Sequence, residues 1–164
     1  MKKFLVGLSV TCFLIVPSVT SAATSDSHWD SNNSVDGKEI RWGSAWGKTK
    51  YTTERNHAIS TWNSMKTIKI AGDTSSTIED LSFTDFTEKS TKLGDWTPFI
   101  GADRIRFNDH NFKNMTPGEK KKVAIHELGH ALGFEHHTSG VMKQGKFSMT
   151  TLDTHIKNDY KKYW

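Results

Sequence analysis

Apolar residues recur along the chain with two periods, and the change from one to the other predicts where strands and helices lie. Ile40 and Trp42 alternate with polar neighbours in the segment 39–46, a pattern typical of a first β-strand. Between residue 53 and about residue 66 the apolar positions instead follow a helical spacing. Four residues form this stripe: Ala58, Ile59, Trp62 and Met65. The early part of the chain therefore predicts a strand followed by a helix.

Shorter alternating runs predict three further strands, at 67–71, 81–86 and 104–108. The segment 72–80 is rich in Ser, Thr and Asp and predicts a loop. The segment 87–103 contains glycine and proline residues typical of turns and predicts a long connection without regular structure.

A capping box marks the start of the clearest helix. Thr116 is followed by Pro117 and, three residues on, by Glu119, an order that favours a helix beginning here. The helical pattern continues to Gly133, because glycine readily adopts the left-handed conformation that ends a helix. A final helix is predicted within 148–164 by a second apolar stripe. Four residues form it: Leu152, Ile156, Tyr160 and Tyr163.

The first residues of the chain are typical of a secretory signal peptide. A basic Met-Lys-Lys opening precedes an apolar run over 4–16 and then small residues, so we expect residues 1–23 to be removed. Cleavage is expected after Ala23, with Ala22 as the neighbouring choice. The run is shorter than the ~20 apolar residues of a membrane-spanning helix, and a retained anchor is the alternative. The protein is thus expected to be secreted and extracellular, with a polar, flexible segment at 24–38.

Signal removal changes the composition in two ways. The only cysteine, Cys12, is lost, so any metal site in the mature chain must use histidine, carboxylate or water. The formal net charge falls from +4 to +2, because Lys2 and Lys3 leave with the signal. This small excess does not indicate nucleic-acid binding, and no membrane partner is expected after cleavage.

Half of the eight histidines lie in one short stretch, "HELGHALGFEHH". His126 and His130 are one helical turn apart, so their imidazoles can bind the same metal ion. Glu127 lies near enough to hold a water without being a ligand, and the turn at Gly133 brings His136 back toward the same ion. Three imidazoles with one open position are the ligand set of a catalytic zinc.

The pattern H-E-x-x-H-x-x-G-x-x-H resembles the zinc signature of the metzincin metalloproteases. Five residues carry it: His126, Glu127, His130, Gly133 and His136. Met142, six residues further on, is similar to the family's Met-turn, and the order of elements is similar to a matrixin catalytic domain. The resemblance implies an α+β, zincin-like fold over 39–164. It would have a small twisted mixed sheet, an N-terminal helix, an active-site helix and a C-terminal helix.

The resemblance also implies an activity, that of a zinc-dependent endopeptidase. His126, His130 and His136 would hold one Zn²⁺, and Glu127 would take a proton from the attacking water and pass it to the leaving amine. Met142 would form an apolar floor under the metal. The partner would be a protein or peptide substrate, aligned along an edge strand at 104–108. We expect a monomer.

Three departures from the family qualify this picture. With no cysteine after cleavage, a cysteine-switch mechanism of latency is not expected. The segment 72–103 has no histidine, so the second, structural zinc of matrixins is not expected either. Ca²⁺ is possible through scattered carboxylates, although no calcium-loop motif joins them and ordinary surface aspartates are the preferred interpretation. Five residues are concerned: Asp73, Asp80, Asp85, Asp95 and Asp103.

The other histidines and a lysine run receive structural interpretations. His57 is expected to pack or face solvent beside the first helix, and His110 to lie in a loop. The spacing from Gly133 favours His136 over His137 as the third ligand, which leaves His137 on the surface. The lysines 120–122 are expected on a solvated helix face.

Two other functions remain open from the sequence. One is a zinc-binding secreted protein that recognises peptides or surfaces without cutting them. The other is a toxin-like or bacteriocin-like effector with a structural zinc. An intact Glu127 argues against the first, because a non-catalytic protein has no need of the base.

Overall fold

The structure, a computed structural model, describes residues 28–164, and the predicted signal peptide lies outside these residues. Nine elements follow one another along this part of the chain: β1 (Glu39–Gly43), α1 (Thr52–Asn63), β2 (Lys69–Gly72), β3 (Leu81–Phe86), β4 (Gly94–Thr97), β5 (Asp103–Asn108), α2 (Asp109–Phe112), α3 (Pro117–Ala131) and α4 (Thr154–Tyr163). The predicted strands and the three long helices are present, with boundaries shifted by a few residues. The short helix α2 and the strand β4 were not predicted.

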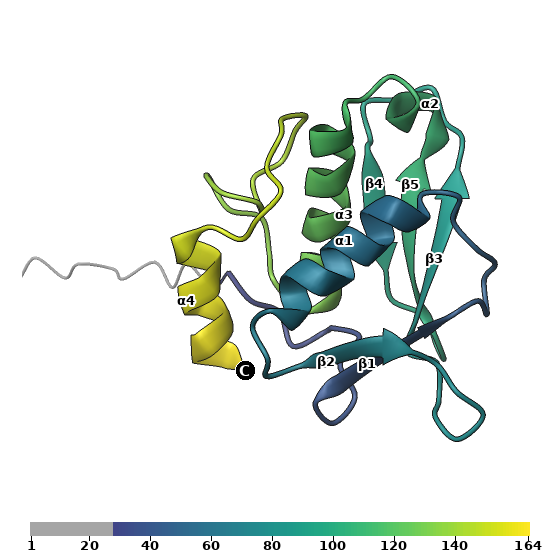
Figure 1. Ribbon diagram of the computed structural model, residues 1–164, viewed down its shortest axis with the longest axis vertical. Coiled ribbons are helices and arrows are strands. Elements are labelled where there is room, and N and C mark those ends of the chain that lie inside the picture. The colour runs from purple at the N-terminus through teal and green to yellow at the C-terminus, as the bar shows by residue number, and fades with distance from the viewer. Residues whose placement is uncertain (1–27) are drawn as a thin grey trace, which may run out of the picture.

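The five strands form one mixed sheet in the order β2-β1-β3-β5-β4 (Figure 1). The first four run parallel, and β4 pairs antiparallel with β5 at the edge of the sheet. With α1, α3 and α4, this sheet confirms the predicted α+β fold class. The prediction that 104–108 is an edge strand is wrong, because β5 is paired on both sides.

The edge strand β4 arises from a stretch without an alternating apolar pattern. Trp96 pairs with Ile105 across the ladder, and Asp95 pairs with Arg106. The Arg106 guanidinium donates two hydrogen bonds to the Asp95 carboxylate, at 2.8 and 2.6 Å. The strand is therefore stabilised by a cross-strand ion pair and one aromatic residue, which a search for apolar alternation does not detect.

Helices α1 and α3 pack against each other beside the sheet, and one tryptophan joins them (Figure 1). Trp62 is fully buried and donates a hydrogen bond from its indole nitrogen to the carbonyl oxygen of Ile125, at 2.9 Å. Its ring stacks on Phe134 and lies 5.9 Å from the ring of Tyr160 in α4. The C-terminal helix thus completes the same hydrophobic core, and three residues of its predicted stripe are buried.

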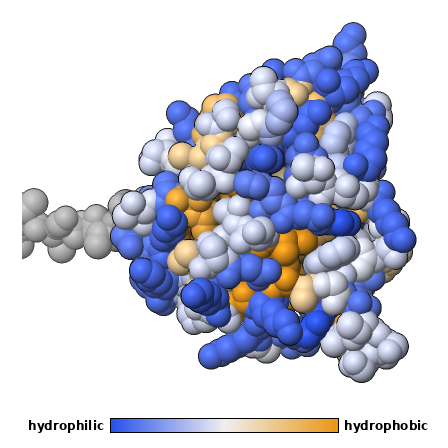
Figure 2. Space-filling view, viewed as in Figure 1, coloured by the Kyte–Doolittle hydropathy of each residue, from blue (hydrophilic) through white to orange (hydrophobic). Residues whose placement is uncertain are grey.

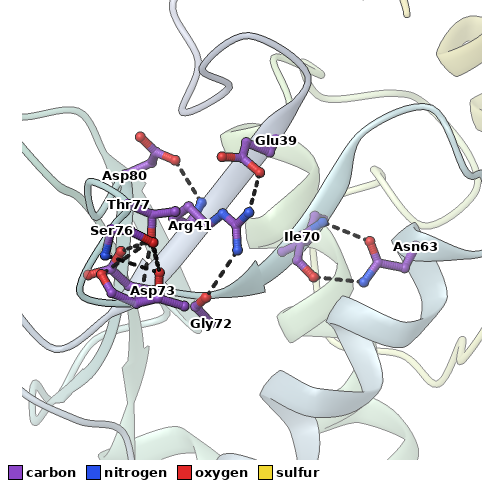
Figure 3. Close-up of polar contacts among 10 residues, drawn as sticks. Glu39, Arg41, Asn63, Ile70, Gly72, Asp73, Ser76, Thr77 and Asp80 are labelled. Atoms are coloured by element: carbon purple, nitrogen blue, oxygen red, sulfur yellow. Dashed lines mark hydrogen bonds and ion pairs between the residues drawn. The ribbon is translucent and has the colours of Figure 1, made fainter.

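A polar network fixes β1 and β2 beside the end of α1 (Figure 3). The side-chain amide of Asn63 bonds both the backbone nitrogen and the backbone oxygen of Ile70, each at 2.8 Å. In β1 the guanidinium of Arg41 contacts Glu39, and its backbone nitrogen donates to Asp80. These contacts set where β2 begins its pairing.

The segment 28–36, which belongs to the stretch predicted to be polar and flexible, is hydrogen-bonded to the end of α3 and to the turn that follows it. Asp30 donates to the backbone oxygen of Gly133 at 2.7 Å, and Ser34 to that of Ala131 at 2.8 Å. The first described residue, His28, accepts from the backbone nitrogen of Glu135 at 2.8 Å.

The surface seen in Figure 2 is largely hydrophilic, with an apolar area in its lower half. A shallow depression between α1 and β2 is lined by apolar residues including Ile59, Ile70 and Ala71. Within residues 28–164, no helix has both the length and the apolar character needed to cross a membrane.

Candidate active site

The helix α3 is fixed at both ends by local interactions that its sequence specifies. At its start, Thr116 accepts a hydrogen bond from the backbone nitrogen of Glu119, and the Glu119 carboxylate accepts one from Thr116 in return. At its end, Gly133 has a φ of +90° and donates to the carbonyl of His130, while Phe134 donates to that of Gly129. This is a Schellman motif, and it reverses the chain directly after the second histidine.

The reversal brings three imidazoles together. The Nε2 atom of His130 lies 3.2 Å from the Nε2 of His126 and 3.2 Å from the Nε2 of His136. Backbone carbonyls orient two of the rings: Nδ1 of His126 is 3.0 Å from the oxygen of Val141, and Nδ1 of His130 is 2.7 Å from that of Phe134. Helix, turn and following segment thus all position this group.

These hydrogen bonds define which nitrogens are protonated, and so test whether a metal fits. A carbonyl only accepts, so Nδ1 of both His126 and His130 carries the hydrogen and the two Nε2 atoms present lone pairs. Two lone pairs at 3.2 Å repel unless a cation lies between them. Burial lowers the pKa of His126 to about 2 and that of His130 to about 4, which favours the neutral, ligating form. The three histidines can therefore hold one metal ion.

Met142 packs against α3 at Gly129. Its side chain is fully buried, and a Cβ added to Gly129 would lie 2.4 Å from its sulfur. Glycine at position 129 thus allows α3 and the methionine to pack closely. The backbone oxygen of Met142 also accepts from the nitrogen of His137 at 3.1 Å.

Glu127 is buried between α3 and the edge strand. A Cβ at Gly94 of β4 would come within 3.1 Å of its carboxylate and within 2.9 Å of the backbone oxygen of Arg106. Glycine at this position therefore lets the strand approach the helix. Burial raises the pKa of Glu127 to about 8, the Asp95 charge adds to that rise, and the Lys122 charge opposes it.

An open cleft of about 600 Å³ runs past these groups, within the range of ligand sites. The floor is the histidine face of α3, which includes Val123. Residues 91–96, around β4, form one wall, and Gln144 and Gly145 line the other side. The outer edge of β4 has no strand partner among residues 28–164, so its backbone is available for pairing.

Lys122 also lines this cleft, and its prediction as a solvated residue is wrong. It is 2 % exposed, and its ammonium donates hydrogen bonds to the backbone oxygens of Lys143 and Gly145. Burial lowers the pKa of Lys122 to about 8. A signal was present in the sequence, because Lys122, His126 and His130 are spaced by four residues on one helix face.

The remaining predicted side chains separate into three cases. His57 is partly buried and bonds the backbone oxygen of Thr150 at 2.8 Å. His110 lies in α2, away from the cleft lining. His137 is 6 % exposed, so its prediction as a surface residue is wrong. It belongs to a second group of ionisable side chains on another side of the chain reversal.

The five aspartates considered for calcium are each engaged separately. Asp85 accepts from Thr49, Asp95 from Arg106 and Asp103 from Ser34. Asp80 accepts from the backbone of Arg41, and Asp73 from Thr77. Among the described residues, none of the five belongs to a group of donors placed to hold a metal ion.

Comparisons with known proteins add little to this geometry. No protein-family model matches the chain, and no curated protein does. A solved structure that resembles it is High choriolytic enzyme 1, a hatching enzyme zinc-protease from Oryzias latipes (medaka fish), with a TM-score of 0.39 and 17 % identity. The match covers 79 % of this chain and 55 % of that one, so this chain spans about half its length. At this TM-score the likeness establishes neither a family nor an activity.

Proposed function

We propose that this protein is a secreted zinc-dependent endopeptidase of the metzincin type. One observation carries the proposal: the lone pairs of His126 and His130 converge with His136 at the floor of an open cleft. Glu127 lines the same cleft, beside the ligands and not among them. The H-E-x-x-H-x-x-G-x-x-H signature and Met142 support the assignment to this clan and, within it, to a matrixin-like enzyme.

The three imidazoles are neutral nitrogen donors with one side open to the cleft, as in catalytic zinc sites. When bound, zinc supplies Lewis acidity, which acidifies water and polarises a carbonyl group. Glu127 accepts the proton of the attacking water on its carboxylate and delivers it to the nitrogen of the departing amine. Burial raises the pKa of Glu127 above its ordinary value, which makes its carboxylate a stronger proton acceptor.

The substrate is proposed to lie in extended conformation along β4. The free edge of this strand offers backbone donors and acceptors beside the cleft, and an added strand pairs with such an edge. We expect the chain of a longer peptide to continue past the three histidines in both directions, which would make the cleavage internal. The partner is thus a protein or peptide, and the active form is proposed to be a monomer.

The test is a digestion of a peptide library by the purified protein, with and without chelator. Cleavage should disappear on chelation and return with Zn²⁺, while the far-UV circular dichroism stays mostly unchanged. Glu127→Gln should reduce kcat/KM by about 10²–10⁴-fold without lowering zinc content, since it removes the base and no ligand.

Glu135→Gln is the matched control, because Glu135 is exposed and lies beside the third ligand. It should retain near-parental activity. Undiminished cleavage by Glu127→Gln would contradict the mechanism. Zinc binding without cleavage of any library member would instead support a recognition protein.

A further inference from the structure

A second group of metal-ligating side chains lies on the other side of the chain reversal at Gly133. It joins His28 of the N-terminal segment, His137 after α3, and His155 and Asp159 of α4. One donor atom from each of these four residues lies within 4.8 Å of every other. The group shares no residue with the candidate active site, although His137 directly follows His136.

The three distances measured from Asp159 are close to those between ligands of one ion. One oxygen of Asp159, Oδ2, is 3.7 Å from Nδ1 of His28, 3.7 Å from Nε2 of His137 and 3.4 Å from Nε2 of His155. Tetrahedral zinc with bonds of about 2.0–2.1 Å places neighbouring donors about 3.3–3.4 Å apart. The ring centroids are separated by 4.1–5.2 Å, against 4.7–5.2 Å in the active-site group.

Two of these donor atoms are buried without a hydrogen-bond partner. The side chain of His137 is 1 % exposed, and within residues 28–164 neither its Nε2 nor Oδ2 of Asp159 makes a hydrogen bond. The 3.7 Å between them exceeds hydrogen-bond range. Burial of polar atoms without partners costs free energy of folding, and one cation placed between these two atoms would satisfy both.

We infer that His28, His137, His155 and Asp159 form a second, structural zinc site. Three imidazoles and one carboxylate are borderline and hard donors that suit Zn²⁺. The four donors complete a tetrahedral shell and leave no open position, as in structural zinc sites. The sequence predicted a single catalytic ion, and the second group would add a structural one. This second site lies outside the segment 72–103, in which the structural zinc of matrixins was not expected.

The position of this site gives it a definite mechanical role. It joins the N-terminal segment and the C-terminal helix to the turn that carries the third active-site histidine. Among residues 28–164, no backbone carbonyl orients the Nδ1 atom of His136, in contrast to His126 and His130. Metal bound at His137 fixes the adjoining peptide unit and thereby positions His136.

Zinc stoichiometry tests the inference independently of peptidase activity. The purified protein with Glu127→Gln, which prevents self-cleavage, is stripped with chelator and titrated with Zn²⁺ under calorimetry, followed by metal analysis. We expect two equivalents per chain. In the same Glu127→Gln background, His155→Ala alone should leave one equivalent of zinc. His126→Ala alone should also leave one equivalent, because each substitution removes a different site. His110→Ala is the matched control and should retain two.

His155 is chosen because its side chain is 47 % exposed, so its loss should leave the core intact, as circular dichroism will verify. In the thermal unfolding of these proteins, saturating Zn²⁺ should raise Tm less in the His155→Ala protein than in the His110→Ala control. One equivalent in the protein that carries only Glu127→Gln, or two equivalents in the protein that also carries His155→Ala, would overturn the second site. Neither result bears on whether Glu127 catalyses peptide hydrolysis.

Discussion

The two histidine groups of this protein are built by opposite means. The active-site group takes its three rings from residues 126–136, so one helix and one turn assemble it. The second group takes its donors from residues 28 to 159 and exists only when the N-terminal segment and α4 both reach His137, in the segment after α3. A spacing motif specifies the first group, and tertiary structure specifies the second.

This difference predicts that the two groups fail in different ways. Loss of a ligand in the first group removes one metal donor from a helix that is anchored by its own cap and turn. Loss of a ligand in the second group releases a contact between distant segments, so stability is affected before chemistry is.

The largest effect is expected for His126→Ala. Removing this ligand should lower kcat/KM by about 10³-fold or more, because the metal supplies both water activation and charge stabilisation. Metal analysis should still find zinc at the second group. A variant that lost all bound zinc would show that the two groups do not load independently.

Gly133→Ala should disturb both groups at once. Its φ of +90° disfavours a side chain, and a Cβ would lie 2.5 Å from the backbone oxygen of Asp30. We expect the free energy of unfolding to fall by about 2–4 kcal/mol, measured by urea denaturation. Gly145→Ala is the control, since Gly145 has a φ of +100° with nothing within 4 Å. It should cost only about 1–2 kcal/mol.

Lys122→Met should change how stability depends on pH. Burial lowers the pKa of Lys122 to about 8 from an ordinary value of 10.5, so between these values the unfolded chain holds a proton that the folded chain has released. Raising the pH therefore favours folding of the parent but not of the variant. In chelated protein, the free energy of unfolding of the parent should rise relative to that of the variant by about 1–3 kcal/mol between pH 7.5 and pH 10.5. Parallel pH curves would contradict this.

The smallest effect is expected for Asp153→Ala. Asp153 caps α4 by accepting from the nitrogen of Ile156 at 3.1 Å, and it also accepts from that of Val141 at 2.9 Å. Its loss should cost about 1–2 kcal/mol in urea unfolding. Because Val141 also orients His126, a small fall in zinc affinity of the first group should accompany it. Asp153→Asn keeps one acceptor oxygen and should show less of both effects.

The sequence specified the active-site helix well because its signals are local. The cap at Thr116, the four-residue histidine spacing and the glycine at 133 all act within one or two turns. The same reasoning missed β4, whose pairing depends on Arg106 from another strand. It also placed Lys122 in solvent, although the carbonyls that accept its hydrogen bonds lie more than twenty residues away.

The error at His137 has the same origin. Relative to the zinc signature it is one position beyond the third ligand, so the motif assigned it no partner. Only the i, i+4 spacing of His155 and Asp159 on the final helix gave a local sign of the second group. The other two donors are brought there by residues 28–36 and by the reversal at Gly133.

The packing of α4 on the core also affects when the site is completed during protein synthesis. Tyr160 packs on Trp62, and the Asp153 carboxylate accepts from the nitrogen of Val141, so the floor of the cleft depends on residues that leave the ribosome after the whole zinc signature. Folding that needs such distant contacts is slow to complete and requires α4 to have been synthesised. A nascent chain therefore carries every residue of the zinc signature before it has a finished site. The order of synthesis therefore delays completion of the site until α4 has been made and has packed on the core.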